Sequence, residues 1–100
     1  KKVARAWSEW EMKACTLAPN DEVISDEECW ALGRHEAHYL SQGCFLEENE
    51  ILENCYKIAH IPLSIVHGRY DMMCPFDNAL ILHKALPLSK LFISHAAGHA

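Results

Sequence analysis

The sequence lacks three features that would each assign a broad class: an excess of basic charge, a long apolar run and a leader core. The net charge is −5 at neutral pH, whereas a nucleic-acid-binding surface needs clustered Lys and Arg side chains to contact phosphates. No apolar run approaches the roughly 20 residues of a membrane-spanning helix. The basic residues 1–5 are not followed by the apolar core of a signal peptide. We therefore expect neither a nucleic acid nor a membrane as a partner.

The cysteines lack the spacings that bind metal or build a disulfide framework. Their number is odd, and no two of them are separated by only two residues, whereas structural zinc sites and small disulfide-rich domains use paired cysteines. This usage predicts free thiols in a reducing, cytoplasmic setting. The five residues are Cys15, Cys29, Cys44, Cys55 and Cys74.

The first sixty residues are acidic and have helical spacing. They contain twelve acidic and six basic side chains. Large apolar residues recur every three or four positions over residues 3–17, which predicts an amphipathic helix. A break follows at residues 19–21. Ser25 and Glu28 then form a capping-box sequence for a second helix that should end near Gln42.

A third, short helix is expected over residues 47–57. Its apolar side chains can share one inner surface with those of Leu46 and Ile58. After Pro62 the pattern is no longer helical. This change of pattern is the predicted domain boundary.

The last forty residues predict a βαβ unit. The short β-branched run 63–66 indicates a buried strand. Residues 77–86 indicate a helix that Asp77 can cap, and residues 90–94 indicate a second strand. Strand, helix and strand within about thirty residues are typical of two parallel strands joined by a crossover. Two strands leave both sheet edges open, so further strands are expected from outside this sequence.

The loops after the two predicted strands carry the residues of chemical interest. The first loop, residues 67–71, ends in Asp71, and the second, residues 95–99, ends in His99. Parallel strands bring such loops to the same edge of a sheet. A carboxylate followed by an imidazole has the order of the last two members of the Ser–Asp–His triad of α/β-hydrolases. The imidazole would relay a serine proton, and the carboxylate would orient the ring.

Each of these residues has an ordinary explanation when taken alone. Asp71 could cap its loop and His99 could be a surface residue, but their pairing across a strand–helix–strand frame favours the triad. No serine lies in a G-x-S-x-G elbow or between a strand and a helix. Cys74 stands inside the acid loop and is a poor candidate for the nucleophile. The chain is therefore expected to lack its nucleophile and to be inactive alone.

Four segments resemble, in the right order, motifs of the proline iminopeptidases, which are serine aminopeptidases of the α/β-hydrolase fold. The likeness covers essentially the whole chain. The most distinctive segment is HIPLSIVHGRYDMMCP at residues 60–75, and the others are residues 6–11, 34–39 and 97–99.

The resemblance implies a fold class and a division of the chain. The fold would be α/β, as the C-terminal fragment of an α/β-hydrolase. Residues 1–58 would form the later part of the helical cap domain. Residues 59–100 would form the truncated C-terminal part of the catalytic domain, with the last βαβ unit of the parallel sheet.

The resemblance also implies an activity and its residues. Members of the family release an N-terminal proline from peptides and need no metal or organic cofactor. Cap-domain glutamates hold the free amino group of the substrate, and the matching positions are Glu11 and Glu36. Opposing carboxylates suit an ammonium group that enters a partly desolvated pocket. Two positions depart from the family pattern, with Ala37 in place of Asn and Leu40 in place of an aromatic residue.

Other interpretations stay open at this stage. An esterase or epoxide hydrolase would share the fold and the triad, and a non-catalytic interaction module would use the same elements only for binding. His35 and His38 are one residue short of the H-E-x-x-H spacing, so no metal site is expected. Apolar surface on the strands and around Trp7 predicts that the isolated chain self-associates.

Overall fold

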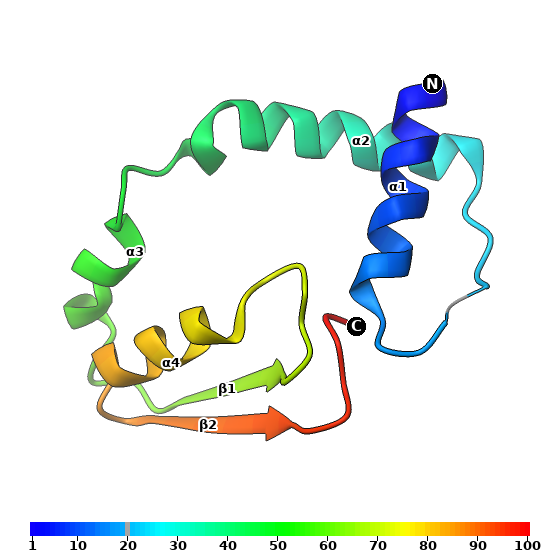
Figure 1. Cartoon of the computed structure of the whole chain (residues 1–100). Helices are drawn as coiled ribbons and strands as arrows, with labels where there is room; N and C mark the ends of the chain where they lie inside the picture. Colours follow the sequence, from blue (N-terminus) through cyan, green and yellow to red (C-terminus); the bar gives the residue numbers. More distant parts are fainter. Residues whose placement is uncertain (20) are drawn as a thin grey trace.

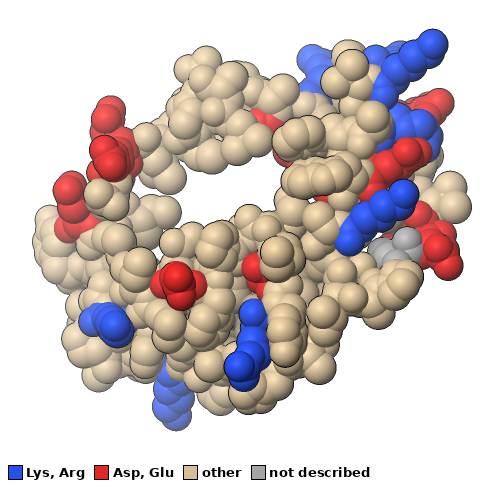
Figure 2. All heavy atoms as spheres, in the orientation of Figure 1, with Lys and Arg blue, Asp and Glu red and all other residues tan. Residues whose placement is uncertain are grey.

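The structure, a computed structural model, describes residues 1–19 and 21–100. It forms a flat ring with extents of 45, 33 and 18 Å, in which the first two helices lie across an opening from the two strands and the last helix (Figures 1 and 2). Mostly uncharged atoms border this opening (Figure 2). The elements in chain order are α1 (Lys2–Cys15), α2 (Asp26–Ser41), η1 (Gly43–Phe45), α3 (Glu50–Glu53), η2 (Cys55–Lys57), β1 (Leu63–Gly68), α4 (Phe76–Ala85) and β2 (Ser89–Ser94).

The first two predicted helices are confirmed as α1 and α2, which pack against each other. The capping box forms as predicted, because the Glu28 amide donates to the Ser25 side chain and the Ser25 amide donates to the Glu28 carboxylate. Arg5 of α1 donates to Asp26 in the first turn of α2. Among the helices of the described residues, none is both long and apolar enough to cross a membrane. The predicted break includes Asn20, which lies outside the described residues.

The predicted βαβ unit is also confirmed. β1 and β2 are parallel, with Ile65 in register with Leu91 and Val66 in register with Phe92. α4 contacts both strands and covers one face of the pair. On the other face Val66 and Phe92 are 72% and 52% exposed, so the predicted open apolar surface is present. The prediction of a buried strand is wrong here, since no described residue covers that second face.

The segment between α2 and β1 is less helical than its sequence indicates. Asn49 adopts a left-handed conformation with φ of 58°, so α3 begins only at Glu50. The tighter 3₁₀ turn η2 follows almost directly. Only four residues of this segment therefore form regular α-helix. The predicted shared inner surface is wrong: within this segment only Cys55 is buried, and its apolar neighbours are exposed.

Asp77 does not cap α4 as predicted. Pro75 occupies the N-cap position and Asp77 lies in the first turn, without a capping hydrogen bond from its side chain. Pro75 has a φ of −53° and a non-helical ψ of 135°, so the helix begins at the next residue. The negative charge of Asp77 still favours this end of α4 through the helix dipole.

Two backbone hydrogen bonds close the ring between α1 and the chain end. The amides of His99 and Ala100 donate to the carbonyl oxygen of Cys15, at 2.7 and 3.0 Å. The C-terminus therefore lies beside the end of α1 (Figure 1). Gly98 permits this contact, because an added Cβ would lie 2.7 Å from the same carbonyl oxygen.

Ser8 gives a test of the packing of α1. Its side chain is fully buried, and the hydroxyl makes no hydrogen bond within the described chain. An unsatisfied buried hydroxyl costs about 1–3 kcal/mol. We therefore expect Ser8→Ala to raise the free energy of unfolding by about 1 kcal/mol in urea denaturation. Ser41→Ala, at an exposed helical serine, controls for helix propensity and should have a smaller effect. A loss of stability in Ser8→Ala would contradict this account.

Candidate active site

The acid loop holds Asp71 in a fixed orientation. The loop leaves β1 at Gly68, and the Oδ1 atom of Asp71 accepts hydrogen bonds from the amides of Met73 and Cys74, at 2.9 and 2.8 Å. Aspartate side chains commonly close turns in this way. The side chain of Asp71 is only 5% exposed, and its second oxygen is left to face the neighbouring loop.

The histidine loop docks onto the acid loop through backbone contacts. The Arg69 amide donates to Ser94 at 2.9 Å, and the Tyr70 amide donates to Ala97 at 3.0 Å. Gly68 makes the approach possible, because an added Cβ would lie only 1.9 Å from the Gly98 carbonyl oxygen. These bonds continue the parallel pairing of β1 and β2 beyond the sheet and bring the two loops together.

Asp71 and His99 form a hydrogen-bonded pair. The Nδ1 atom of His99 donates to Oδ2 of Asp71 at 2.9 Å. Because a carboxylate can only accept, the bond assigns the ring hydrogen to Nδ1 and leaves Nε2 free to accept a proton. His99 is 42% exposed, in contrast to its buried partner. This is the arrangement of a general base whose ring is oriented by a carboxylate.

The hydrogen bonds around Asp71 keep it ionised. Burial raises the pKa of this carboxyl, but the hydrogen bonds from the Cys74 amide, His99 and the Met73 amide outweigh that effect. The pKa of Asp71 therefore lies below its ordinary value. An ionised Asp71 can stabilise the charged imidazolium that forms when His99 takes up a proton.

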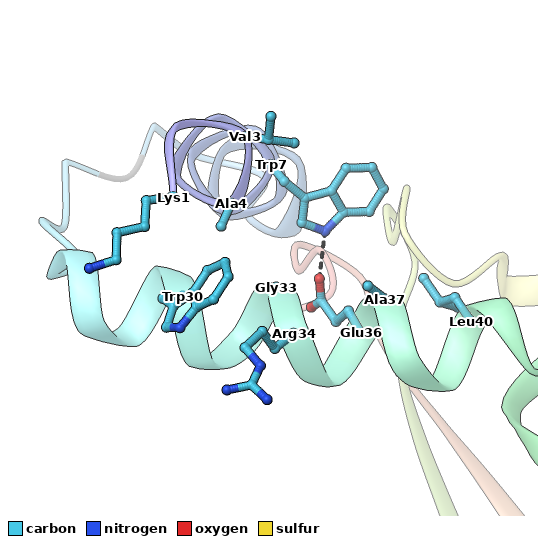
Figure 3. Close-up of a pocket in the computed structure, with 10 residues that line it drawn as sticks. All are labelled: Lys1, Val3, Ala4, Trp7, Trp30, Gly33, Arg34, Glu36, Ala37 and Leu40. Carbon is cyan, nitrogen blue, oxygen red and sulfur yellow. Dashed lines mark hydrogen bonds between the residues drawn. The ribbon is translucent and has the colours of Figure 1, made fainter.

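Glu11 and Glu36 form a carboxylate pair on facing helices. Glu11 is in α1 and Glu36 is in α2, and the indole Nε1 of Trp7 donates to Oε2 of Glu36 at 2.5 Å (Figure 3). Partial burial raises the pKa of Glu11, and a hydrogen bond and repulsion from Glu36 raise it further. The pair is thus a site of unfavourable negative charge.

The carboxylate pair and the Asp–His pair lie in one region around Cys15. The charge of His99 acts on Glu11. Burial raises the pKa of the Cys15 thiol, and Glu11, Asp71, Cys74 and Glu36 raise it further. Glu11, Glu36 and Asp71 are thus near enough to act on the Cys15 thiol, and the amide of His99 donates to the Cys15 carbonyl, although the four residues come from α1, α2 and two loops.

Sequence reasoning missed the residues that orient this region. Helical spacing marks Trp7 only as an apolar residue, whereas in the structure its indole N–H donates to Glu36. Its position one turn before Glu11 was the available signal, since residues four apart share a helix face. The contact made by the Cys15 carbonyl could not be predicted from the sequence, because every residue has a backbone carbonyl.

Two groups of side chains have the residue types of metal ligands. Asp71, Cys74 and His99, within the described chain, present possible ligand atoms within 4.8 Å of one another. The hydrogen bonds from His99 and from the Cys74 amide to Asp71 already account for their closeness. His35 instead contacts the Ala31 carbonyl at 2.8 Å, and the ring of His38 packs 5.4 Å from that of Phe45.

A cavity of about 490 Å³ lies between α1 and α2 (Figure 3). Val3, Trp7, Trp30 and Leu40 supply much of its apolar lining, and Glu36 reaches its edge. The two tryptophans are therefore not part of a closed core in this chain. The cavity adds apolar surface beside the carboxylate pair.

Comparison with known proteins agrees with the motif resemblance. No family model matches the chain. It is 44% identical over 97% of its length to a proline iminopeptidase of Xylella fastidiosa, 42% to one of Xanthomonas citri and 43% to one of Arabidopsis thaliana. The chain spans 33%, 33% and 27% of these relatives, about a third of their length. The resemblance to proline iminopeptidases is confirmed along nearly the whole chain.

Gly68 tests the contact between the two loops. A Gly68→Ala methyl would meet the Gly98 carbonyl at 1.9 Å, so we expect the loops to separate and the free energy of unfolding to fall by about 3 kcal/mol. Gly43→Ala is the control, since its added Cβ meets nothing within 4 Å and only its φ of 57° is unfavourable. It should cost about 1 kcal/mol. Equal losses in the two variants would contradict the close approach.

The carboxylate pair predicts a pH-dependent stability. Because the pKa of Glu11 is raised on folding, the folded chain binds the Glu11 proton more tightly than the unfolded chain does. The folded chain therefore loses stability as the pH rises from the ordinary pKa of Glu11 through its raised pKa. Glu11→Gln should therefore raise the melting temperature at about pH 8 and have no such effect at about pH 3. Glu28→Gln is a control of opposite sign.

The Glu28 control follows from its cap. Hydrogen bonds from Ser25 lower the pKa of Glu28, so its stabilising effect is present at neutral pH and is lost as pH falls through the folded-state pKa. Glu28→Gln should lower the melting temperature at neutral pH and not in acid. If both variants shifted the melting temperature equally at every pH, charge would not be the cause.

Proposed function

We propose that this chain supplies the catalytic acid, the catalytic histidine and the amino-group site of a proline iminopeptidase, a serine peptidase of the α/β-hydrolase fold. The observation that carries the proposal is the 2.9 Å hydrogen bond from His99 to Asp71. It joins loops at the ends of two parallel strands, with the Glu11–Glu36 pair in the same region.

The proposed chemistry needs a nucleophilic serine from outside this sequence. Its hydroxyl would attack the prolyl carbonyl while Nε2 of His99 removes the proton. His99 would then return that proton to the leaving amine, and water would release proline from the acyl-enzyme by the same steps. Asp71 would keep the ring oriented and stabilise its charged form. The chain alone would not turn over substrate.

The carboxylate pair supports a substrate with a free amino terminus. An N-terminal proline carries a secondary ammonium, which can donate to two carboxylates at once. Its positive charge would relieve the repulsion that raises the pKa of Glu11. A blocked amino terminus would leave both carboxylates unpaired in a partly buried site, which disfavours it.

We further propose that the two parts of the chain belong to two domains of the parent protein. Residues 1–58 would belong to a helical cap and residues 59–100 to the catalytic domain, with the sheet continued by strands from outside this sequence. The exposed Val66 and Phe92 side chains support such an extension. All five cysteines are free, which supports a reducing, cytoplasmic setting. The residues of this mechanism call for no metal or organic cofactor.

The decisive test is hydrolysis of a proline amide reporter. The chain would be assayed alone and as the same protein extended upstream through its native reading frame, and activity is expected only in the extended form. Asp71→Asn should lower kcat about 10⁴-fold, because an amide that donates to Nδ1 favours the wrong tautomer of the imidazole. Glu11→Gln and Glu36→Gln should each raise KM roughly 10- to 100-fold, because each removes a charge-assisted hydrogen bond.

Glu53→Gln, at an exposed glutamate of α3, is the matched control and should leave both constants unchanged. Cleavage of an ester but not of proline amides by the extended protein would overturn the substrate assignment and leave the triad. Inactivity on both would favour a binding module.

A further inference from the structure

A second histidine, His67, contacts the acid loop from β1. Its Nε2 atom lies 2.9 Å from the carbonyl oxygen of Cys74. The same atom lies 3.4 Å from Oδ2 of Asp71, the oxygen that binds His99. The His67 side chain is 17% exposed, and its ring packs edge-on against Phe76, with the centroids 5.7 Å apart.

The Cys74 carbonyl decides the protonation of this ring. A carbonyl oxygen can only accept a hydrogen bond, so Nε2 of His67 must carry a hydrogen. The resulting N–H group ties the far end of the acid loop to β1. It also places a positive hydrogen beside the carboxylate of Asp71, at a distance where the attraction is electrostatic.

His67 thus completes the surroundings of Asp71. One oxygen of the carboxylate accepts from the amides of Met73 and Cys74, and the other accepts from His99. His67 holds the carbonyl group of Cys74. The same His67 nitrogen also faces Oδ2 of Asp71, the oxygen that accepts from His99. Both effects keep the carboxylate in one orientation and favour its charged form.

We propose that His67 is a positioning residue for Asp71: it clamps the acid loop through the Cys74 carbonyl and faces the oxygen that orients His99. The role of the resulting Asp–His pair rests on the proposed function, whereas the clamp itself does not. Among the described residues, three other titratable groups lie near Asp71. His99 bonds to it and lowers its pKa, the Cys74 thiol lies within 4.8 Å of it, and the Cys15 thiol of α1 is near enough to feel its charge.

The test uses the extended protein, with its aspartate side-chain carboxyls labelled with ¹³C. The Asp71 signal is identified by its absence in Asp71→Asn and is followed as a function of pH. In His67→Leu the N–H group is lost, and the midpoint of the Asp71 titration should rise by on the order of half a pH unit. In His67→Gln the side-chain amide nitrogen can take the place of Nε2, so the midpoint should stay near that of the unmodified protein.

Phe76→Leu is the matched control, because it removes the ring contact and keeps the N–H group. It should lower stability without moving the Asp71 midpoint. If His67→Leu does not fold, His67→Asn replaces it, since its shorter amide does not reach the Cys74 carbonyl. An unchanged midpoint in a folded Leu or Asn variant, or an equal rise in His67→Gln, would overturn the proposal.

Activity gives an independent measure. His67→Leu should lower kcat about tenfold and leave KM nearly unchanged, because the amino-group site is untouched. A rise in KM with unchanged kcat would contradict a positioning role. The titration needs no substrate, so an inactive extended protein whose Asp71 midpoint rises in His67→Leu would refute the peptidase assignment and leave the clamp established.

Discussion

The carbonyl oxygen of Cys15 is the point on which the arrangement of the site depends. Cys15 is the last residue of α1, and its carbonyl oxygen accepts hydrogen bonds from the amides of His99 and Ala100. These bonds join the helical part of the ring to the loops of the βαβ unit. Without these bonds the carboxylate pair and the Asp–His pair would belong to separate bodies. The bonds involve backbone atoms, so they tolerate many side chains at residue 15 but almost none at Gly98.

The site places three carboxylates in two contrasting environments. Asp71 is surrounded by donors that lower its pKa despite burial, whereas burial and a facing second carboxylate both raise the pKa of Glu11. A charge stabilised by fixed donors is suited to orient a catalytic group, whereas a repelling pair is suited to bind a cation. The same residue chemistry can thus serve orientation in one place and recognition in the other.

The sequence was sufficient where the signal is local. The capping box at Ser25, the parallel strands and the meeting of the Asp71 and His99 loops follow from short patterns, and the structure contains all of them. The prediction of a helix over residues 47–57 was wrong over much of its length, because the spacing of apolar residues does not reveal the left-handed conformation of Asn49. The prediction of buried strands was wrong for Val66 and Phe92, because burial depends on the elements that cover a strand and not on the strand itself. The roles of Trp7 and His67 depend on single polar atoms across the fold, which no periodicity records.

Helix α1 carries two of the contacts on which the site relies. Glu11 and the Cys15 carbonyl are one helical turn apart, about 6 Å along the axis. A helix moves as one unit, so any displacement of α1 that widens the space around Glu11 also strains the bonds to His99 and Ala100. The width of the space around Glu11 and the orientation of the imidazole are therefore not independent degrees of freedom in this protein.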